Sequence, residues 1–412
     1  MRKAHKRRGL GLTLILAAVA ALAFGLAIAN PLTAKAAPSS SHTAAAACVA
    51  KASTPLRVGH ISGIGPAVPA SAACKAANSD SRVLQAIRNA GDNAEGVPPL
   101  IWHGGAVMGT SETGPLVITP IFWNPASNPM AASYKSLITQ YLSDVAKASG
   151  TTTNVFSVLS QYTGSDGQVQ YQVQLGSSIN DTNALPAGGC KLNVKDTKGI
   201  YADGSGYNAC LDDAQVQAEV NAVIAAQKLP TNFAHIYEMY LPKGVEACFA
   251  SGVTTNTQKG AQACTINNEP SAAFCAYHSL AANNSTEYAN LPFPIYLSAT
   301  GFTCGTDVNF PGVIESPNGN PDADTVISPT SHETSELITD PDNNGVTASG
   351  WYDAAGFEIG DECAYIFGPT QGKSGALYNQ VINGHHYMTQ EEFSNSSFFS
   401  SGGGCIQSSS ET

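Results

Sequence analysis

The sequence predicts an α+β domain, in which a mixed sheet is combined with several helices and one helix carries the candidate site. Segments typical of strands and segments typical of helices alternate irregularly along the chain, and no repeat is present. This order favours an α+β domain over a doubly wound parallel sheet. The chain that follows Gly114 is long enough to bury a substantial core.

Four segments have the composition of strands. Residues 115–123 and 233–241 are apolar runs typical of buried strands, although Pro120 should bend or interrupt the first. Residues 168–175 alternate polar and apolar side chains, as a strand with one exposed face does. Residues 294–297 form another short apolar run. We expect these segments to build the sheet.

Three segments are typical of helices. Residues 133–147 place their apolar side chains at helical spacing, and residues 154–162 suggest a shorter helix. A further helix should begin at Asp212 or Asp213, either of which can act as N-cap, and should end before Pro230.

The N-terminus has the pattern of a secretory signal peptide. A basic start precedes an uncharged apolar run over residues 9–29, and Ala34 and Ala36 suit a small-residue cleavage site. We expect residues 1–36 to be removed, with an uncleaved membrane anchor as the alternative because the run could span a bilayer. Residues 37–100 suggest a propeptide, a linker or an N-terminal subdomain, residues 101–395 the folded domain, and residues 396–412 a flexible tail.

The cysteines indicate an oxidising compartment. All ten follow the expected cleavage site, the number is even, and no C-x-x-C pair occurs. Disulfides are therefore favoured over thiolate zinc clusters and thioredoxin-type chemistry. The sequence does not fix the connectivity; Cys190–Cys210, which would close a glycine-rich loop, and Cys48–Cys74 are the local pairings that we predict.

The charge balance excludes some partners. Charged residues make up 12% of the chain and the formal net charge is −11. An acidic surface repels nucleic acid and anionic lipid, so we expect no nucleic acid as a partner, and no stable membrane partner unless the signal peptide stays uncleaved. Such a composition is typical of secreted proteins, and it does not identify a substrate.

The most informative motif is H-E-x-x-E at residues 332–336. Residues four apart share one face of a helix, so His332 and Glu336 can point at one metal ion. Glu333 lies beside them, where a general base for a water molecule would sit. The motif is a variant of the two-histidine zinc helix H-E-x-x-H, with glutamate in place of the second histidine.

The surrounding sequence suggests how the site is completed. Ser328 can cap the helix with Pro329 at its first position, and Pro341 should end it. Glu358 should supply a third ligand, and Asp361 should be an alternative ligand or a partner that orients one. If the segment after residue 357 is helical, Glu358 shares a face with Asp361 or Glu362.

The predicted ligands, one imidazole and two carboxylates, leave an open position, as catalytic zinc sites do. Zinc is the expected ion. Manganese or calcium could compete because the site is rich in oxygen.

These residues resemble the Exordium-like, or phosphate-induced, family of secreted proteins. That family has an H-E-x-x-E helix continuing into T-[ND]-P, then W-Y and E-I-[AG]-D-x-C. Here the matching segments are His332–Glu336, Thr339–Pro341, Trp351–Tyr352 and Glu358–Cys363. Weaker similarity covers Cys275–His278 and 383–387. The resemblance implies a zincin-like fold and an extracellular or cell-wall role, with a peptide or cell-wall substrate. The spacing from Glu336 to Glu358 is also similar to that of thermolysin-type zinc peptidases.

Other signals carry less weight. Residues 340–345 read D-x-D-x-N-G, which could open a calcium loop but lacks the final glutamate, so an ordinary turn is favoured. His278, His385 and His386 could each add a ligand or an oxyanion donor, although a packing role is favoured for each. Glu238, on a predicted strand, is assigned no role. No G-x-S-x-G elbow supports a serine hydrolase.

The sequence therefore predicts a secreted metal-dependent hydrolase, with a zinc metallopeptidase as the leading form. His332, Glu336 and Glu358 would hold the ion, with Asp361 close by and Glu333 as the base. The alternative is a non-catalytic extracellular or cell-wall binding protein on the same scaffold.

Overall fold

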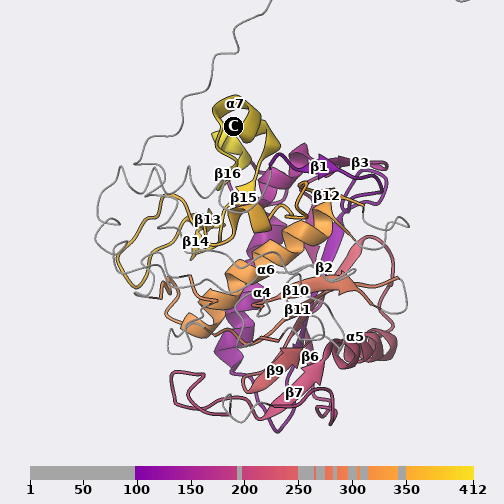
Figure 1. The fold of residues 1–412 in the computed structure, drawn as a ribbon, viewed down its shortest axis with the longest axis vertical. Coiled ribbons are helices and arrows are strands. Elements are labelled where there is room, and N and C mark those ends of the chain that lie inside the picture. Colours follow the sequence, from indigo (N-terminus) through magenta and orange to yellow (C-terminus); the bar gives the residue numbers. More distant parts are fainter. Residues whose placement is uncertain are drawn as a thin grey trace, which may run out of the picture. The chain divides into compact units, whose positions relative to one another are not determined.

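The computed structural model describes residues 98–412 apart from 193–196, 249–263, 266–273, 282–284, 296–303, 307–313 and 342–348 (Figure 1). The predicted signal peptide, the Cys48–Cys74 pair, nearly all of the segment 37–100 and most of the possible calcium loop lie outside these residues. The described part is a mixture of helices and mixed sheets, which confirms the α+β class.

The central sheet has the strand order β10-β11-β8-β2-β5, and β6 also pairs with β2. Strands β11, β8, β2, β5 and β6 run parallel to one another, whereas β10 lies antiparallel to β11 at one edge. The bounds are β2 (Leu116–Trp123), β5 (Val173–Leu175), β6 (Ile179–Asp181), β8 (His235–Tyr240), β10 (Tyr277–Leu280) and β11 (Glu287–Leu291). The sequence did not predict β10 or β11.

Strand β2 continues through Pro120, although this proline was predicted to bend or interrupt the strand. The carbonyl of Ile118 accepts a hydrogen bond from Gly176 on the β5 side, at 2.7 Å. Alternate residues direct their backbone groups to the same side of a strand, so Pro120 faces that side as well. There β5 pairs only with Leu116–Ile118 and β6 only with Ile121–Trp123. The missing N–H of Pro120 therefore falls in the break between two partner strands, where no hydrogen bond is lost.

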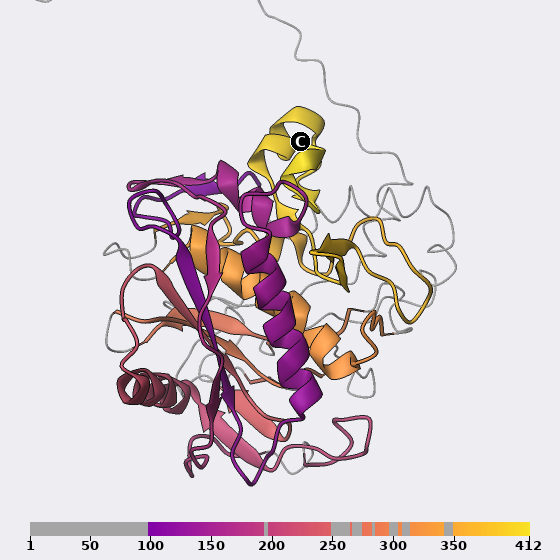
Figure 2. The same cartoon turned by 180° about the vertical axis from the view of Figure 1, so that it is seen from behind.

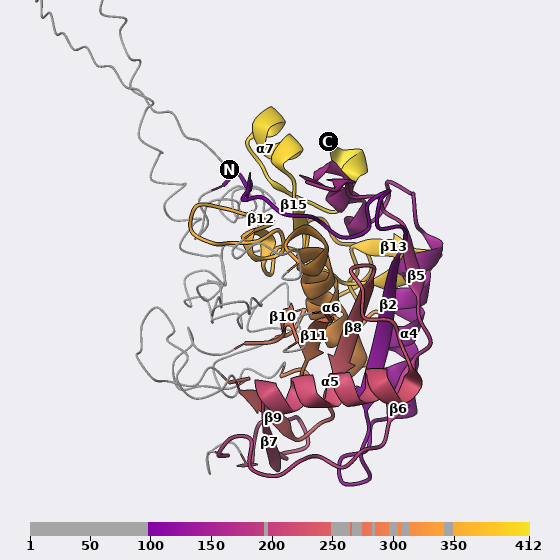
Figure 3. The same ribbon diagram turned by 90° about the vertical axis from the view of Figure 1, so that its right-hand side faces the viewer.

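Helices cover both faces of this sheet. On one face Ile236 and Tyr240 of β8 pack with α4 (Ala132–Lys147) and α6 (Pro321–Thr339), which lie side by side in Figure 2. On the other face Tyr237 and Met239 pack with α5 (Asp213–Gln227), which runs across β2 and β8 in Figure 3. Asp212 caps α5 through a capping box with Gln215, as one of the two predicted caps would.

Helix α6 begins earlier than predicted. Its N-cap is Asn320 and Pro321 occupies the first turn, so Ser328 and Pro329 lie inside the helix. Asn320 followed by Pro321 is the same kind of start signal as Ser328 followed by Pro329, and the structure uses the first of them. Residues Ala323–Thr339 are all buried, so the helix runs through the interior (Figure 1).

Most remaining strands form small pairs around this core. The pairs are β1 (Ile101–Trp102) with β12 (Trp351–Tyr352), β3 (Thr163–Gly164) with β4 (Gly167–Gln168), β7 (Ala209–Asp212) with β9 (Val245–Cys248), β13 (Gln380–Ile382) with β14 (His385–Tyr387), and β15 (Glu392–Phe393) with β16 (Cys405–Ile406). Short 3-10 helices are η2 (Val155–Gln161), η6 (Asp361–Cys363) and η7 (Ser409–Glu411).

Three other expectations differ from the structure. Residues 396–412 are not an irregular tail, because they contain most of α7 (Asn395–Ser401) and all of β16 and η7, and Cys405 is bonded to Cys363. The predicted strand 168–175 is limited to its two ends, in β4 and β5. Of the predicted strand 294–297, Pro294 and Ile295 lie beyond the end of β11 and outside any strand.

Four disulfides join described cysteines: Cys190–Cys210, Cys248–Cys264, Cys275–Cys304 and Cys363–Cys405. The first confirms a predicted pair, and together they are compatible with an extracellular protein. Among the helices of the described ranges, none combines the length and the apolar character needed to cross a bilayer.

Candidate metal centre

Helix α6 presents three chemically active side chains in the interior. His332, Glu333 and Glu336 each have 0% of their surface exposed. His332 and Glu336 lie one helical turn apart, and the Nε2 atom of His332 is 2.9 Å from Oε1 of Glu336. The predicted pairing of these two side chains is therefore present in the structure.

The turn that follows β12 brings Asp361 to the same place. The Oδ1 atom of Asp361 lies 3.8 Å from Nε2 of His332, and the backbone N–H of Asp361 donates to Oε1 of Glu336 at 3.2 Å. The only helical turn in this segment is the short η6 that starts at Asp361, so Glu358 precedes it instead of sharing a helix with Asp361. The backbone N–H of Glu358 donates to Oδ2 of Asp361 at 3.3 Å.

Gly360 allows this turn to pass directly over the imidazole. A Cβ atom on Gly360 would lie 2.5 Å from Nδ1 of His332 and 2.8 Å from Cγ and Cε1. Those distances are far below van der Waals contact, so only glycine fits unless the ring moves. The close approach of the His332 ring thus explains why the E-I-G-D segment has glycine at position 360.

Gln390 fixes the orientation of the His332 ring. Its Nε2 atom donates to the carbonyl of Gly360 at 2.7 Å and lies 2.9 Å from Nδ1 of His332. The carbonyl can only accept, so this nitrogen is the donor in both contacts and Nδ1 of His332 accepts. Neutral His332 then carries its proton on Nε2, the nitrogen that lies 2.9 Å from Oε1 of Glu336 without the geometry of a hydrogen bond. A cation held by Nε2 would replace that proton and put the ring proton on Nδ1, and the side-chain amide of Gln390 would then have to turn so that its Oε1 atom accepts it.

His278 is the site residue for which sequence reasoning favoured a packing role. It lies on edge strand β10, is 2% exposed, and faces α6. Its Nδ1 atom is 3.0 Å from Oε2 of Glu333 and 3.5 Å from Oε2 of Glu336, and its Nε2 atom is 3.5 Å from Oε2 of Glu358. The weak similarity at Cys275–His278 was the one signal in the sequence that pointed to it.

The carboxylate of Glu358 lies beside Nε2 of His278, whereas the ligand atoms grouped with His332 belong to Glu336 and Asp361. All five predicted residues are nevertheless buried within this one region.

The site contains several buried carboxylates and no buried lysine or arginine within the described residues that could neutralise them. All six arginines of the chain precede residue 89, and none of the lysines in the described ranges is buried. Burial raises the pKa of Glu336 well above its usual range, and the carboxyls of Asp361, Glu358 and Glu333 raise it further. Burial lowers the pKa of His332 to about 3, so its imidazole is neutral, as a metal ligand must be.

The donor set fits a divalent cation. One ligand atom each from His332, Glu336 and Asp361 lies within 4.8 Å of the others. Nε2 of His332 and Oε2 of Glu336 are both buried without a hydrogen-bond partner. An imidazole with carboxylates suits zinc, and the oxygen content also suits manganese.

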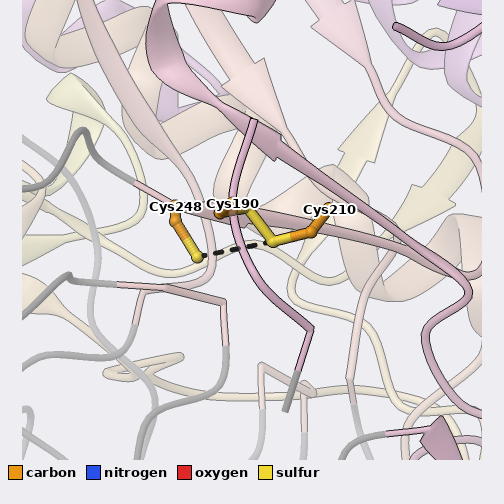
Figure 4. A group of neighbouring side chains, drawn as sticks. All are labelled: Cys190, Cys210 and Cys248. Atoms are coloured by element: carbon orange, nitrogen blue, oxygen red, sulfur yellow. Dashed lines mark hydrogen bonds between the residues drawn. A yellow bond between two sulfur atoms is a disulfide. The ribbon is translucent and has the colours of Figure 1, made fainter. Parts of the chain in front are cut away.

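A second region rich in possible ligands is excluded by its bonding. Cys190, Cys210 and Cys248 lie together, with the Sγ atoms of Cys210 and Cys248 3.8 Å apart (Figure 4). Each of these sulfurs is already part of a disulfide, so none is a thiolate ligand.

The other histidines considered from the sequence serve different contacts. Nδ1 of His385 lies 2.7 Å from Oδ2 of Asp144 on α4, and His386 stacks on Tyr378. Glu238, to which no role was assigned, is fully buried under α6 and accepts hydrogen bonds from Thr334 and Tyr240.

Comparisons with protein-family models, with curated proteins and with solved structures gave no match to this chain.

Proposed function

We propose that this protein is a metal-dependent hydrolase whose cation is held by His332, Glu336 and Asp361. The observation that carries the proposal is the convergence of these three ligand atoms within 4.8 Å in a buried position. Two buried atoms support it: Nε2 of His332, whose ring is neutral, and Oε2 of Glu336. Neither has a hydrogen-bond partner, and burying such an atom is costly unless a cation or proton meets it.

Each side chain has a separate task in this proposal. A bound divalent cation supplies Lewis acidity, which polarises a carbonyl group and acidifies a water molecule. Glu333 would act as the general base for a water molecule, since it neighbours the ligands and its Oε2 atom lies 3.0 Å from Nδ1 of His278. Gln390 and Gly360 keep the ring of His332 in place. Glu358 faces the other nitrogen of His278.

The finer assignment is a zinc metallopeptidase of zincin-like architecture in an exported protein. Four disulfides and the predicted signal peptide support export. The H-E-x-x-E helix and its resemblance to a secreted family support the peptidase assignment, with a peptide or cell-wall polymer as substrate. Zinc is the proposed ion, with manganese and calcium as competitors.

One variant pair tests the ligand and the base separately. Glu336→Ala should lose the metal measured in purified wild-type protein, because a ligand is removed. Glu333→Gln should keep the cation at His332 and lose chelator-sensitive cleavage of a peptide library. Metal content unchanged by Glu336→Ala would disprove the ligand assignment, and full activity in Glu333→Gln would disprove the base.

A non-catalytic role is the second candidate, and burial is the observation that favours it. His332, Glu333, Glu336 and Glu358 are all 0% exposed, so the described residues leave the centre covered. A cation there could serve only to hold β10, α6 and the turn at Gly360 together. This candidate predicts bound metal together with no cleavage of any peptide in the library.

A further inference from the structure

We propose that the centre binds two divalent cations, with Glu336 as the carboxylate that bridges them. The second cation would lie among Nδ1 of His278, Oε2 of Glu333 and Oε2 of Glu336. This inference rests on the proposed function, because Glu336 is the shared ligand of both positions.

The geometry contains two separate groups of ligand atoms. His278, Glu333 and Glu336 form one, and His332, Glu336 and Asp361 form the other; in each, the ligand atoms lie within 4.8 Å of one another. Glu336 belongs to both groups through different oxygens, because Oε1 is 2.9 Å from His332 and Oε2 is 3.5 Å from His278. A carboxylate that uses its two oxygens in this way is a natural bridge, and paired metal ions typically lie about 3.5–4 Å apart.

The second group has the spacing of ligands around one ion. Metal–ligand bonds of about 2.1 Å at tetrahedral angles separate two ligand atoms by about 3.4 Å. Nδ1 of His278 lies 3.0 Å from Oε2 of Glu333 and 3.5 Å from Oε2 of Glu336. The Oε2 atom of Glu336 is fully buried and has no hydrogen-bond partner, so it is available on the side that faces His278.

The environment of His278 provides the partner that a metal-bound histidine needs. Both ring nitrogens of His278 face carboxylates, which can only accept: Nδ1 lies 3.0 Å from Oε2 of Glu333, and Nε2 lies 3.5 Å from Oε2 of Glu358. The neutral ring has one proton, so without a cation it can donate to only one of them, and its other lone pair faces carboxylate oxygen. A cation at Nδ1 leaves the ring proton on Nε2, where Glu358 accepts it. A carboxylate–histidine–metal arrangement satisfies all of these atoms. It also gives Glu358 a role as the group that orients His278.

Charge favours more than one ion. Five buried carboxyls lie close together here, from Glu333, Glu336, Glu358, Asp361 and Glu392, and the described ranges contain no buried lysine and no arginine. One divalent cation would compensate only two of their negative charges in the interior, whereas two cations would compensate four. Glu333 is then a ligand in the doubly loaded centre and a free base only in the singly loaded one.

Metal stoichiometry tests the proposal. The full chain is treated with chelator, reloaded with excess Zn²⁺ or Mn²⁺, freed of unbound ion and assayed for metal per chain. Wild type should hold two ions, and His278→Gln, His332→Gln and Glu333→Gln should hold one each. His386→Gln, which changes an exposed histidine on β14, is the matched control and should hold two.

The outcomes separate this proposal from the proposed function. One ion per wild-type chain, or two ions retained by folded His278→Gln, would overturn the second site and leave the first in place. No ion in folded wild-type chain would overturn both. If the His278 variant does not fold, the magnetic resonance spectrum of wild-type protein loaded with Mn²⁺ still tests the second site. Two equivalents should then give the resonance spectrum of a spin-coupled pair, and two isolated Mn²⁺ signals would contradict the bridge.

Discussion

Gly360 shows how a residue without a side chain can determine a site. Its backbone lies against the ring of His332, and the N–H group of the next residue, Asp361, binds the carboxylate of Glu336. Its φ of −79° is open to any residue, so the requirement for glycine comes from contact and not from backbone strain. The positions of the His332 ring and the Glu336 carboxylate therefore both depend on the close approach of the Gly360 backbone.

Replacing Gly360 by alanine should push the ring of His332 away from its ligand position. We expect a loss of stability of about 1–3 kcal/mol from overpacking and a weaker affinity for the first cation. Titration with Zn²⁺ and denaturant unfolding measure the two effects. Combining Gly360→Ala with His332→Ala provides the control, because the stability penalty of the new methyl group should largely disappear once the ring is gone. A penalty of equal size in both backgrounds would rule out this contact as its cause.

At the scale of elements, α6 is held to the sheet by polar contacts as well as apolar ones. Glu238 on β8 accepts a hydrogen bond from Thr334 at 2.8 Å and from Tyr240 at 2.7 Å. Burial outweighs these two donors and raises the pKa of Glu238 to about 7. The interface that carries the site helix therefore contains a carboxyl group that titrates near neutral pH.

The stability of the domain should consequently fall as Glu238 ionises. The folded-state pKa is above the unfolded value of 4.5, so this group's contribution is complete below pH 4.5 and is lost as the pH rises toward 7. The loss should reach about 3 kcal/mol, from 1.36 kcal/mol per pKa unit. Urea unfolding of wild type and Glu238→Gln between pH 4.5 and 8 measures it. The variant should lack this part of the pH dependence, and parallel curves would show that Glu238 titrates normally.

The elements also show where sequence reasoning succeeds. Helices α4 and α5 and strands β2 and β8 were predicted because each has a clear apolar period or run, and Asp212 caps α5 as proposed. The start of α6 was missed because Asn320–Pro321 and Ser328–Pro329 are equally good local signals. Choosing between them requires knowing that the whole helix is buried.

The candidate site was predictable only in part, for a similar reason. His332, Glu333 and Glu336 are close because helical geometry places them so, and the sequence contains that information. His278 comes from a four-residue strand with no strong pattern, and it approaches α6 only because β10 forms the sheet edge. The proximity of Asp361 depends on the turn at Gly360. Long-range contacts of this kind leave no local signal.

At the scale of the whole molecule, a disulfide connects the C-terminal region to the candidate metal centre. Cys363 follows Asp361 by two residues and is bonded to Cys405, which joins the end of the chain to η6. The backbone N–H of Phe393 on β15 also donates to the carbonyl of Ile359 at 3.1 Å. The C-terminal region thus supports the turn that presents Asp361.

Removing this bond should weaken both the fold and the proposed metal site. The Cys363→Ser, Cys405→Ser double variant should lose about 2–4 kcal/mol of stability, since the bond closes a loop with a sequence separation of 42. Its Zn²⁺ affinity should fall as well. The Cys190→Ser, Cys210→Ser variant is the matched control, with a similar kind of stability loss and unchanged Zn²⁺ affinity. Equal affinities in both variants would show that the C-terminal bond does not support the site.

The distribution of arginine has a practical consequence for protein preparation. Because Arg88 is the last arginine, an arginine-specific endoprotease has no cleavage site in residues 89–412. Complete digestion therefore separates every described residue, intact, from everything up to Arg88. The digested and undigested proteins can then be compared in the same peptide-cleavage assay, which measures how the N-terminal segment affects the proposed peptidase activity.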